Sequence, residues 1–358
     1  MRIGVDARPL CVPTFGIGRY TEALLPRMIQ APGIEWFLYA DRPLLGTWQQ
    51  SNVTVRSSPS SNSLLSLMRT QLGFARHARA DSLDVFWSPR HHLPLTLDPE
   101  IAAVVTIHDL VWQHFPETML RKNLLVERLL MPPSVRKADA LIAVSAATCT
   151  DLLAAWPEVA DRTVVIHEAA DPVDVSPTES ETPYFVFLGT LEPRKNLPRL
   201  IAAFARALPD LPTGCRLKLI GATGWRTGIE AIVREHNVSA HVDIMGHVSD
   251  ERLHATLAGA IALCLPSLYE GFGLPALEAM QHGTPVIGAS VSSIPEIVGG
   301  GGVLIDPRNV DAIRDALMLM ALDPARRQAL SAEARQQAGL FSWDRAAAET
   351  LEVFRRFA

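Results

Sequence analysis

Residues 260–278 read AIALCLPSLYEGFGLPALE, and this stretch decides the expected fold. The apolar run Ala260–Leu265 is typical of a buried strand in a parallel sheet. Gly271 and Gly273 then permit a turn in which the backbone approaches a ligand closely. Pro275 is typical of a first helical turn, whose free N–H groups can donate to ligand oxygens. The stretch therefore predicts a strand–loop–helix unit with a binding loop at the carboxyl end of the strand.

Two carboxylates bracket this turn. Glu270 lies in the loop, and Glu278 is expected within the first turn of the helix. A carboxylate pair suits a polyhydroxylated ligand, because each oxygen accepts a hydrogen bond from a hydroxyl and two oxygens can hold a vicinal diol. For the pattern in isolation, a capping glutamate at a strand–turn–helix link is the favoured alternative. The motif described next favours the ligand site.

The segment Gly189–Asn196, GTLEPRKN, follows the expected strand Tyr184–Leu188. Asn196 is a favourable N-cap for the helix after it. Arg194 and Lys195 then precede a helix N-terminus, where the dipole is already positive and cations are disfavoured. An anion between them resolves the conflict, because arginine and helix N–H groups bind phosphate oxygens. Two solvated surface cations are an equal alternative for the pair alone, but with the carboxylate motif we favour phosphate.

A glycine-containing loop, Thr14–Thr21 or TFGIGRYT, follows the first expected strand. Gly16 and Gly18 permit this loop to face a phosphate, although a flexible strand–helix turn is a nearly equal alternative. Thr21 occupies the position of the third glycine in GxGxxG, which argues against a dinucleotide site.

His108 and Asp109 follow the buried run Ala102–Ile107. Polar residues at the carboxyl end of a parallel strand lie where ligands bind. His108 can donate to a sugar hydroxyl, and Asp109 can orient the imidazole or accept from a hydroxyl; a packed, satisfied histidine is the alternative. Three further histidines have no convincing metal-ligand spacing: His91, His92 and His114.

Length and composition indicate a globular protein of two domains. The chain has 358 residues, with 48% hydrophobic and 20% charged residues, and this length exceeds one ordinary core. The net charge of −5 argues against general nucleic-acid binding. We expect no membrane span and no signal peptide. The four cysteines show neither CxxC nor zinc spacing, so reduced, mostly buried thiols of a cytoplasmic protein are expected.

Short apolar runs alternate with helical patterns, which predicts two parallel sheets covered on both faces, an α/β fold. The expected strands are Arg2–Val5, Trp36–Tyr39, Val53–Val55, Val85–Trp87, Ala102–Ile107, Ala140–Val144 and Thr163–Ile166, then Tyr184–Leu188, Leu217–Ile220, Val242–Met245, Ala260–Leu265, Pro285–Ile287 and Gly302–Ile305. The acidic, Pro/Ser/Thr-rich residues 171–183 are expected to link domains 1–170 and 184–340. A final helix within 341–358 is expected to return to the first domain.

With these elements placed, the chain resembles glycosyltransferase family 4, retaining enzymes of the GT-B fold, over essentially its whole length. GTLEPRKN and EGFGLPALE are the most specific pieces, and MRIGVDARPL, GIGRYTEALL, HDL, ADALIAVS and FSWDRAAAETL support them. The resemblance implies two doubly wound Rossmann-like domains that face a cleft, with a nucleotide-sugar donor bound by the C-terminal domain.

The resemblance also implies roles for single residues. Glu270 contacts the donor sugar, His108 lies beside it, Arg194 and Lys195 clamp the diphosphate, and Glu278 binds the ribose. The donor-binding set is completed by Gly16, Gly18, Asp109, Val248, Phe272, Gly273 and Leu274. Many members have two adjacent glycines where this chain has FGIG, which leaves open which glycine lies nearest the donor.

GIGRYT together with EPRKN is most similar to bacterial mannosyl- and D-rhamnosyltransferases of O-antigen and related polysaccharides. This similarity implies GDP-mannose or GDP-D-rhamnose as donor, no further cofactor, and a saccharide acceptor that is lipid-linked. Because Arg194 and Lys195 can stabilise charge on the leaving phosphate, we expect no metal. Retention can use a double displacement or a same-face substitution, and the resemblance favours the latter.

A basic amphipathic stretch, residues 53–80, has Arg56, Arg69, Arg76 and Arg79 but no Asp or Glu. It suits an anionic membrane surface or a lipid diphosphate, although an ordinary surface helix is slightly favoured. Arg121–Lys122 and Arg136–Lys137 form a second basic cluster with the same two interpretations. The chain is thus expected in the cytoplasm, with peripheral contact to the inner face of the cell membrane as an option.

Two rival functions stay open at this point. A GT-B-like nucleotide-sugar 2-epimerase shares the architecture, but it needs an acid/base set in place of the carboxylate and Arg–Lys motifs. A silent partner subunit that binds a nucleotide-sugar or a lipid acceptor is expected to lack one of Glu270, Arg194 or Lys195, and all three are present.

Overall fold

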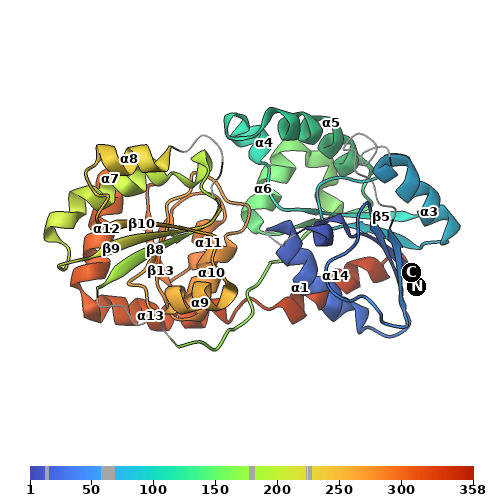
Figure 1. Cartoon of the computed structure of the whole chain (residues 1–358). Helices are drawn as coiled ribbons and strands as arrows, with labels where there is room; N and C mark the ends of the chain where they lie inside the picture. Colours follow the sequence, from blue (N-terminus) through green and yellow to red (C-terminus); the bar gives the residue numbers. More distant parts are fainter. Residues whose placement is uncertain (13–15, 58–68, 177–181, 223, 225–227) are drawn as a thin grey trace. The chain divides into compact units, whose positions relative to one another are not determined.

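The computed structural model describes residues 1–12, 16–57, 69–176, 182–222, 224 and 228–358 (Figure 1). It divides into two compact units. Unit 1 comprises Met1–Glu168 together with Trp343–Ala358, and unit 2 comprises Ala169–Ser342. Of the expected linker 171–183, residues 177–181 lie outside the described part. No helix in the described part is long and apolar enough to cross a bilayer.

Unit 1 is built on a seven-stranded parallel sheet with the strand order β3-β2-β1-β4-β5-β6-β7. The strands are β1 (Arg2–Asp6), β2 (Glu35–Ala40), β3 (Val53–Ser57), β4 (Val85–Ser88), β5 (Ala102–Ile107), β6 (Ala140–Ala143) and β7 (Thr163–Val165). The order reverses between β1 and β4. In an open α/β sheet such a reversal leaves a crevice outside the carboxyl ends of the two strands, where ligands bind.

Helices cover both faces of this sheet. They are α1 (Ile17–Ile29), α3 (Phe74–Ala80), α4 (Val111–His114), α5 (Arg121–Lys137), α6 (Ala146–Ala155) and α14 (Trp343–Arg355). α1 and α14 lie side by side (Figure 1). The fully buried ring of Phe354 packs between Trp36 and Trp87, with centroid separations of 6.5 and 5.7 Å. The next residue of β2, Phe37, belongs to the core that includes residues of α3, α5 and α6, as strand alternation requires.

Unit 2 is built on a six-stranded parallel sheet with the order β10-β9-β8-β11-β12-β13. The strands are β8 (Tyr184–Leu188), β9 (Arg216–Ile220), β10 (Val242–Gly246), β11 (Leu263–Leu265), β12 (Val286–Ala289) and β13 (Gly302–Ile305). Here the order reverses between β8 and β11. The two loops that carry the predicted motifs are the loops that follow these two strands.

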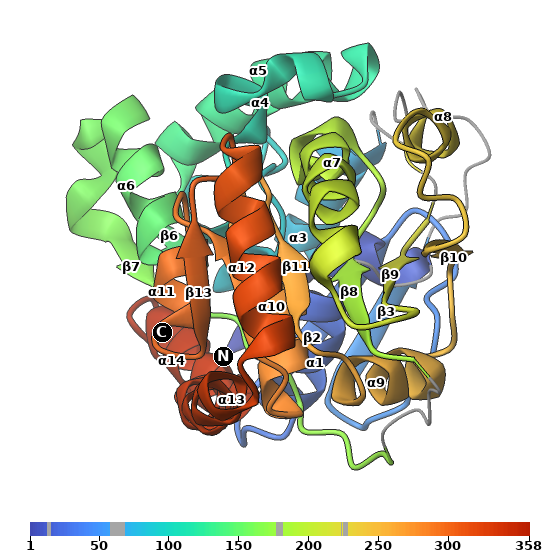
Figure 2. The same ribbon diagram turned by 90° about the vertical axis from the view of Figure 1, so that its left-hand side faces the viewer.

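Two helical layers enclose the sheet of unit 2 (Figures 1 and 2). One layer contains α7 (Leu197–Ala207), α8 (Ile229–Glu235) and α12 (Val310–Leu322); the other contains α9 (Asp250–Ala258), α10 (Leu274–Gln281) and α13 (Pro324–Ala338), with α11 (Ile294–Val298) packed against α10. Leu200, Ile201 and Phe204 of α7 are fully buried and belong to the core that this helix forms with residues of the sheet.

All the predicted strands are present, and the two-sheet α/β architecture is confirmed. The largest boundary error is at β11, which begins at Leu263 rather than Ala260. The N–H of Ala260 still donates to the carbonyl of Leu257 in α9, and residues 260–262 belong to no regular strand. The expectation for the cysteines holds only in part. Cys215 and Cys264 are buried thiols, whereas Cys11 and Cys149 are partly exposed.

Candidate active site

The switch point of unit 2 brings the two predicted motifs into direct contact. Arg194 and Lys195 follow β8, and Glu270 follows β11. Nη1 of Arg194 lies 2.9 Å from Oε2 of Glu270, and Nζ of Lys195 lies 2.6 Å from Oε1 of the same carboxylate. The anion that the sequence suggested between these cations is supplied within the chain, and the prediction of a phosphate beside them stays a prediction. Glu270 is that anion, and the motifs form one cluster.

This cluster is buried and ionised. Lys195 and Glu270 each expose 7% of their surface. Burial acts to raise the pKa of Glu270, but Lys195 and Arg194 outweigh it and hold that pKa at about 2. Burial lowers the pKa of the Lys195 ammonium, and the carboxylate of Glu270 opposes this shift. Removal of one partner from such a pair leaves an uncompensated buried charge, which is strongly destabilising.

Arg194 connects the two loops beyond its ion pair with Glu270. Its Nη1 donates to the carbonyl of Tyr269 over 2.5 Å, and its Nη2 donates to Oε1 of Glu192 over 2.6 Å. In the reverse direction, the N–H of Leu268 donates to the carbonyl of Arg194 over 2.9 Å. The guanidinium is thereby fixed in orientation. Glu192 lies in the GTLEPRKN motif but was not predicted to take part.

Asn196 does not cap α7 in the predicted manner. It occupies the N-cap position, but its backbone is left-handed (φ 60°, ψ 30°) and its side chain makes no capping bond. Instead, its Nδ2 donates to the carbonyls of Pro266 (3.0 Å) and Pro307 (2.6 Å). The side chain therefore joins the loops after β8, β11 and β13, which local sequence cannot show.

The loop after β12 supports the backbone of the glutamate motif. The N–H of Glu270 donates to Oγ of Ser292 over 2.9 Å. Oγ of Ser293 lies 3.0 Å from the carbonyl oxygen of Glu270 and 2.7 Å from that of Phe272. The turn is thus held on both sides of Gly271. The contacts of these two serines with the glutamate loop were not predicted, because their partners are more than 20 residues away.

Gly273 is the N-cap residue of α10 and adopts a conformation that favours glycine. Its φ is +109°, and a Cβ built there would lie 2.8 Å from Cδ1 of Ile294. Leu274 and Pro275 then occupy the first two helical positions. The placement of Glu278 in the first turn is wrong: that turn contains no acidic residue, and Glu278 lies in the second turn, where it is buried.

In unit 1, His108 is oriented by a residue that sequence analysis missed. Its Nδ1 lies 2.9 Å from Oε1 of Glu168, and its Nε2 lies 3.0 Å from the carbonyl oxygen of Pro89. Asp109 does not orient the imidazole, because its Oδ1 accepts the N–H of Val111 instead. Glu168 follows β7, just as His108 follows β5. This position beyond the end of a strand is the sequence feature by which Glu168 could have been found.

The two histidines that precede His108 in the sequence, His91 and His92, contact a carboxylate. His91 and His92 lie 3.3 and 3.0 Å from Oε2 of Glu127. The backbone N–H of His108 donates to Nε2 of His91 over 3.1 Å, so that nitrogen carries a lone pair. Across the described ranges, no group of three or more His, Cys, Asp or Glu residues is arranged to hold a metal ion.

Three predicted donor-binding residues, Gly16, Gly18 and Val248, lie at or near the end of a helix or strand. Gly16 precedes α1 with φ +50°, and Gly18 is buried in the first turn of that helix. Residues 13–15 of the same loop lie outside the described part. Val248 is partly exposed two residues after β10.

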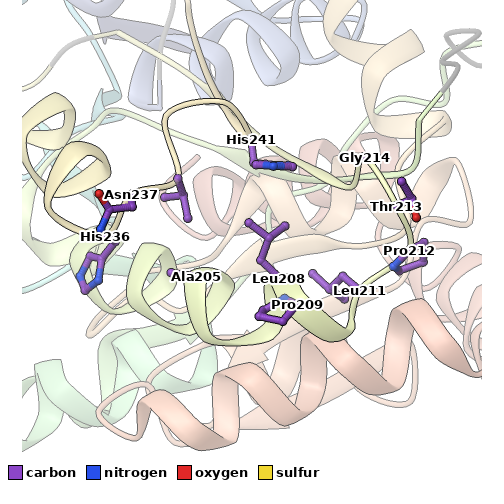
Figure 3. Close-up of a pocket in the computed structure, with 11 residues that line it drawn as sticks. Ala205, Leu208, Pro209, Leu211, Pro212, Thr213, Gly214, His236, Asn237 and His241 are labelled. Atoms are coloured by element: carbon purple, nitrogen blue, oxygen red, sulfur yellow. The ribbon is translucent and has the colours of Figure 1, made fainter.

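A surface hollow in unit 2 lies at the other edge of the sheet from the charged cluster. It has a volume of about 440 Å³ and lies around the end of α7, the turn 208–214 and residues 236–241 (Figure 3). These segments precede β9 and β10 or lie beside their amino ends. Because ligands of parallel sheets bind outside the carboxyl ends, the hollow is not the candidate active site.

Comparison with known proteins decides the family. Residues 16–173 match the family described as Glycosyltransferase Family 4, and residues 173–337 match Glycosyl transferases group 1. The O-antigen chain mannosyltransferase B of Escherichia coli is 30% identical, with 99% of this chain and 100% of the relative covered. The chain belongs to glycosyltransferase family 4. This family 4 enzyme is therefore a glycosyltransferase, as the resemblance implied.

Other relatives and solved structures agree with the family and the fold. An alpha-(1->4)-mannosyltransferase of Mycolicibacterium hassiacum is 30% identical over 62% of this chain and 55% of its own. Sucrose-phosphate synthase of Thermosynechococcus elongatus superposes with a TM-score of 0.79 at 21% identity, covering 99% and 98% of the two chains. WaaG, a glycosyltransferase of lipopolysaccharide biosynthesis, gives 0.77 at 16%, covering 99% of each. The family 4 enzyme has the GT-B fold.

The low pKa of Glu270 predicts acid-sensitive stability for this glycosyltransferase. The folded-state pKa lies below the ordinary value of 4.5, so the contribution is present above pH 4.5 and is lost as pH falls toward 2. The contribution is on the order of 3 kcal/mol. Urea unfolding followed between pH 7 and pH 3 should show a shallower pH dependence for Glu270→Gln than for the wild type. The exposed Glu235→Gln on α8 is the matched control and should leave the profile unchanged; an unchanged profile for Glu270→Gln would contradict the ionised cluster.

Proposed function

We propose that the enzyme is a retaining mannosyltransferase that takes mannose from GDP-mannose, with GDP-D-rhamnose as the second candidate donor. The proposed acceptor is a lipid-linked saccharide of bacterial surface polysaccharide synthesis. The name of the whole-length relative, an O-antigen chain mannosyltransferase, supports this donor sugar and this process. Two further relatives named as mannosyltransferases support the same sugar.

The observation that carries the catalytic part is the buried contact of Glu270 with Lys195 and Arg194. An ammonium has three N–H donors, and Glu270 accepts one of those of Lys195, so two are left for phosphate oxygens. Arg194 adds the second positive charge. Both cations are fixed before a donor binds, and preorganised charge of this kind stabilises a leaving group without further rearrangement.

The proposed reaction is a same-face substitution. As the bond from the anomeric carbon to the diphosphate breaks, negative charge grows on the phosphate beside Lys195 and Arg194. A phosphate oxygen of the donor accepts the proton of the attacking hydroxyl. Glu270 positions the sugar and supports the positive charge that develops on it, while Glu278 binds the ribose. Glu270 can contact the sugar while it pairs with Lys195 and Arg194, because each carboxylate oxygen has a second lone pair.

His108 is proposed to lie beside the donor sugar. Its ring nitrogens contact Glu168 and the carbonyl of Pro89. Donation to a sugar hydroxyl therefore requires that one of these contacts be released. The remaining proposed donor contacts are those of Gly16, Gly18, Asp109, Val248, Phe272, Gly273 and Leu274.

A donor panel with excess EDTA tests the proposed function. Because Arg194 and Lys195 supply the positive charge that a diphosphate leaving group needs, we expect transfer or slow donor hydrolysis with GDP-mannose or GDP-D-rhamnose to survive the chelator. Loss of activity in EDTA with recovery on Mn²⁺ would contradict the electrostatic mechanism. Metal-free transfer from a UDP-sugar alone would keep the mechanism and overturn the donor, and an epimerised donor would support the 2-epimerase instead.

Replacement of Lys195 by alanine tests the phosphate clamp. Loss of one preorganised contact to the leaving group costs about 2–4 kcal/mol of transition-state stabilisation, so kcat should fall about 30- to 1,000-fold. Circular dichroism and the unfolding midpoint separate this effect from loss of the buried ion pair. Arg206→Ala, an exposed cation on α7, is the control. A normal kcat in Lys195→Ala would remove the clamp from the mechanism.

We also propose peripheral contact with the inner face of the cell membrane. Helix α5 supports this proposal better than residues 53–80 do. Of residues 53–80, 58–68 lie outside the described part, Val53–Ser57 forms β3, and Arg56 pairs with Asp81 over 2.6 Å. In contrast, four large apolar side chains are exposed at or near the start of α5: Leu120 (39%), Leu125 (58%), Val126 (36%) and Leu129 (62%).

The exposed face of α5 has the composition of an interfacial helix. Leu125 and Leu129 lie one turn apart on the same face, with the exposed Arg121, Lys122 and Arg128 around them. The one acidic residue of the helix, Glu127, is turned to His91 and His92. The outward face is thus apolar and cationic, which suits an anionic lipid surface.

Vesicle binding tests this face. We expect the enzyme to sediment with vesicles that contain phosphatidylglycerol, less in high salt, and only weakly with phosphatidylcholine alone. Leu125→Ser/Leu129→Ser should weaken binding about tenfold or more. Leu322→Ser/Leu340→Ser, two equally exposed leucines of unit 2, should not. A dimer that dissociates in the α5 variant would show instead that a second copy covers this face.

A further inference from the structure

The crevice at the switch point of unit 1 contains two arginines. Arg8 lies two residues after β1, and Arg90 lies two residues after β4. β1 and β4 are the strands between which the order of the sheet reverses. Both side chains therefore belong to the edge of the sheet where ligands of doubly wound domains bind.

Arg8 is fully engaged within the chain. Its Nε and Nη2 contact the two carboxylate oxygens of Asp6 over 2.8 and 2.5 Å. Its Nη1 donates to Oγ1 of Thr70 over 2.8 Å. This bidentate pair matches a partly buried cation with a buried anion, which is the usual arrangement for such groups.

Arg90 has no such arrangement. It is partly buried, and its guanidinium makes no hydrogen bond or ion pair with any residue in the described ranges. The charges of four residues influence the pKa of Arg90: Arg8, Asp6, Glu127 and Asp41. Asp6 is already occupied by Arg8, and Glu127 by His91 and His92.

Burial and the charge of Arg8 lower the pKa of Arg90. An arginine nevertheless stays protonated in proteins. Its positive charge is thus held in a partly desolvated place with no dedicated partner, where it costs stability. A ligand anion would provide the missing partner.

The backbone at Arg90 is rigid. Oγ of Ser88 lies 2.9 Å from the carbonyl oxygen of Arg90 and 2.7 Å from that of His92. The carbonyl of Pro89 contacts the ring of His108, and the N–H of Leu93 donates to Oγ of Ser134 over 2.9 Å. The loop is therefore fixed before a ligand arrives, as a preorganised binding site requires.

We propose that Arg90 binds a phosphate group of the sugar acceptor at the β1/β4 crevice of unit 1. This inference rests on the proposed transferase function and gives its acceptor a definite chemistry. Guanidinium groups match phosphate oxygens bidentately, and a lipid-linked saccharide carries phosphate next to its first sugar. The diphosphate of the donor is assigned to Arg194 and Lys195 under the proposed function. The donor diphosphate and the acceptor phosphate are therefore bound by different residues.

Calorimetry with inorganic pyrophosphate tests the site without turnover. The protein is first saturated with GDP, or with whichever nucleoside diphosphate the donor panel identifies, so that the Arg194–Lys195 cluster is occupied. Pyrophosphate should then bind the wild type, and Arg90→Gln should weaken it about 10- to 100-fold. Arg90→Lys should keep part of the affinity, because it keeps the charge but loses the fork.

The controls separate this site from the donor site and from the fold. Arg79→Gln, which removes an 82% exposed cation of the same unit, should bind pyrophosphate as the wild type does. Equal affinity for GDP in all variants shows an intact donor site. Farnesyl diphosphate replaces pyrophosphate in a second arm: tighter binding than pyrophosphate that Arg90→Gln abolishes supports a lipid diphosphate, and equal binding supports a phosphosugar.

Two results would overturn the proposal: no pyrophosphate binding to the nucleotide-saturated wild type, or equal affinity in wild type and Arg90→Gln. Neither depends on transfer from a GDP-sugar. A chain that binds pyrophosphate through Arg90 but transfers no sugar would refute the proposed function and leave this site standing.

Discussion

The contact of one carboxylate, Glu270, with two cations, Lys195 and Arg194, is the interaction on which the candidate site depends. Each partner alone would be a buried, unpaired charge, and such groups are expensive. Together they tie the loop after β8 to the loop after β11. The same contact leaves N–H donors of Lys195 available for a ligand, so one ion pair serves both stability and the proposed chemistry.

The position of this cluster follows from sheet topology. Parallel strands end at the same edge, and where the order reverses the two loops diverge and leave space. In unit 2 the reversal falls between β8 and β11, and in unit 1 between β1 and β4. The two sites differ in whether each cation contacts a carboxylate. In unit 2 both cations contact a carboxylate, whereas in unit 1 Arg8 has Asp6 and Arg90 has no such partner among the described residues.

Local patterns were sufficient for much of this structure. Apolar runs located the strands because a parallel strand buried on both faces must be hydrophobic throughout. The motifs identified the family because their glycines, proline and charged residues occur in a fixed order, and the relatives confirm it. Local rules failed where a distant partner competed: Asn196 bonds to Pro266 and Pro307 instead of capping α7.

The sequence by itself determined the two-sheet α/β architecture, the order of its elements and the residues of the two motifs, because these depend on spacing along the chain. Only the tertiary structure decided which charges meet. The contact of Glu270 with Lys195 spans 75 residues, and that of His108 with Glu168 spans 60. No periodicity encodes such pairs. They form because parallel strands far apart in sequence end at one edge, and burial there leaves each charge in need of a partner.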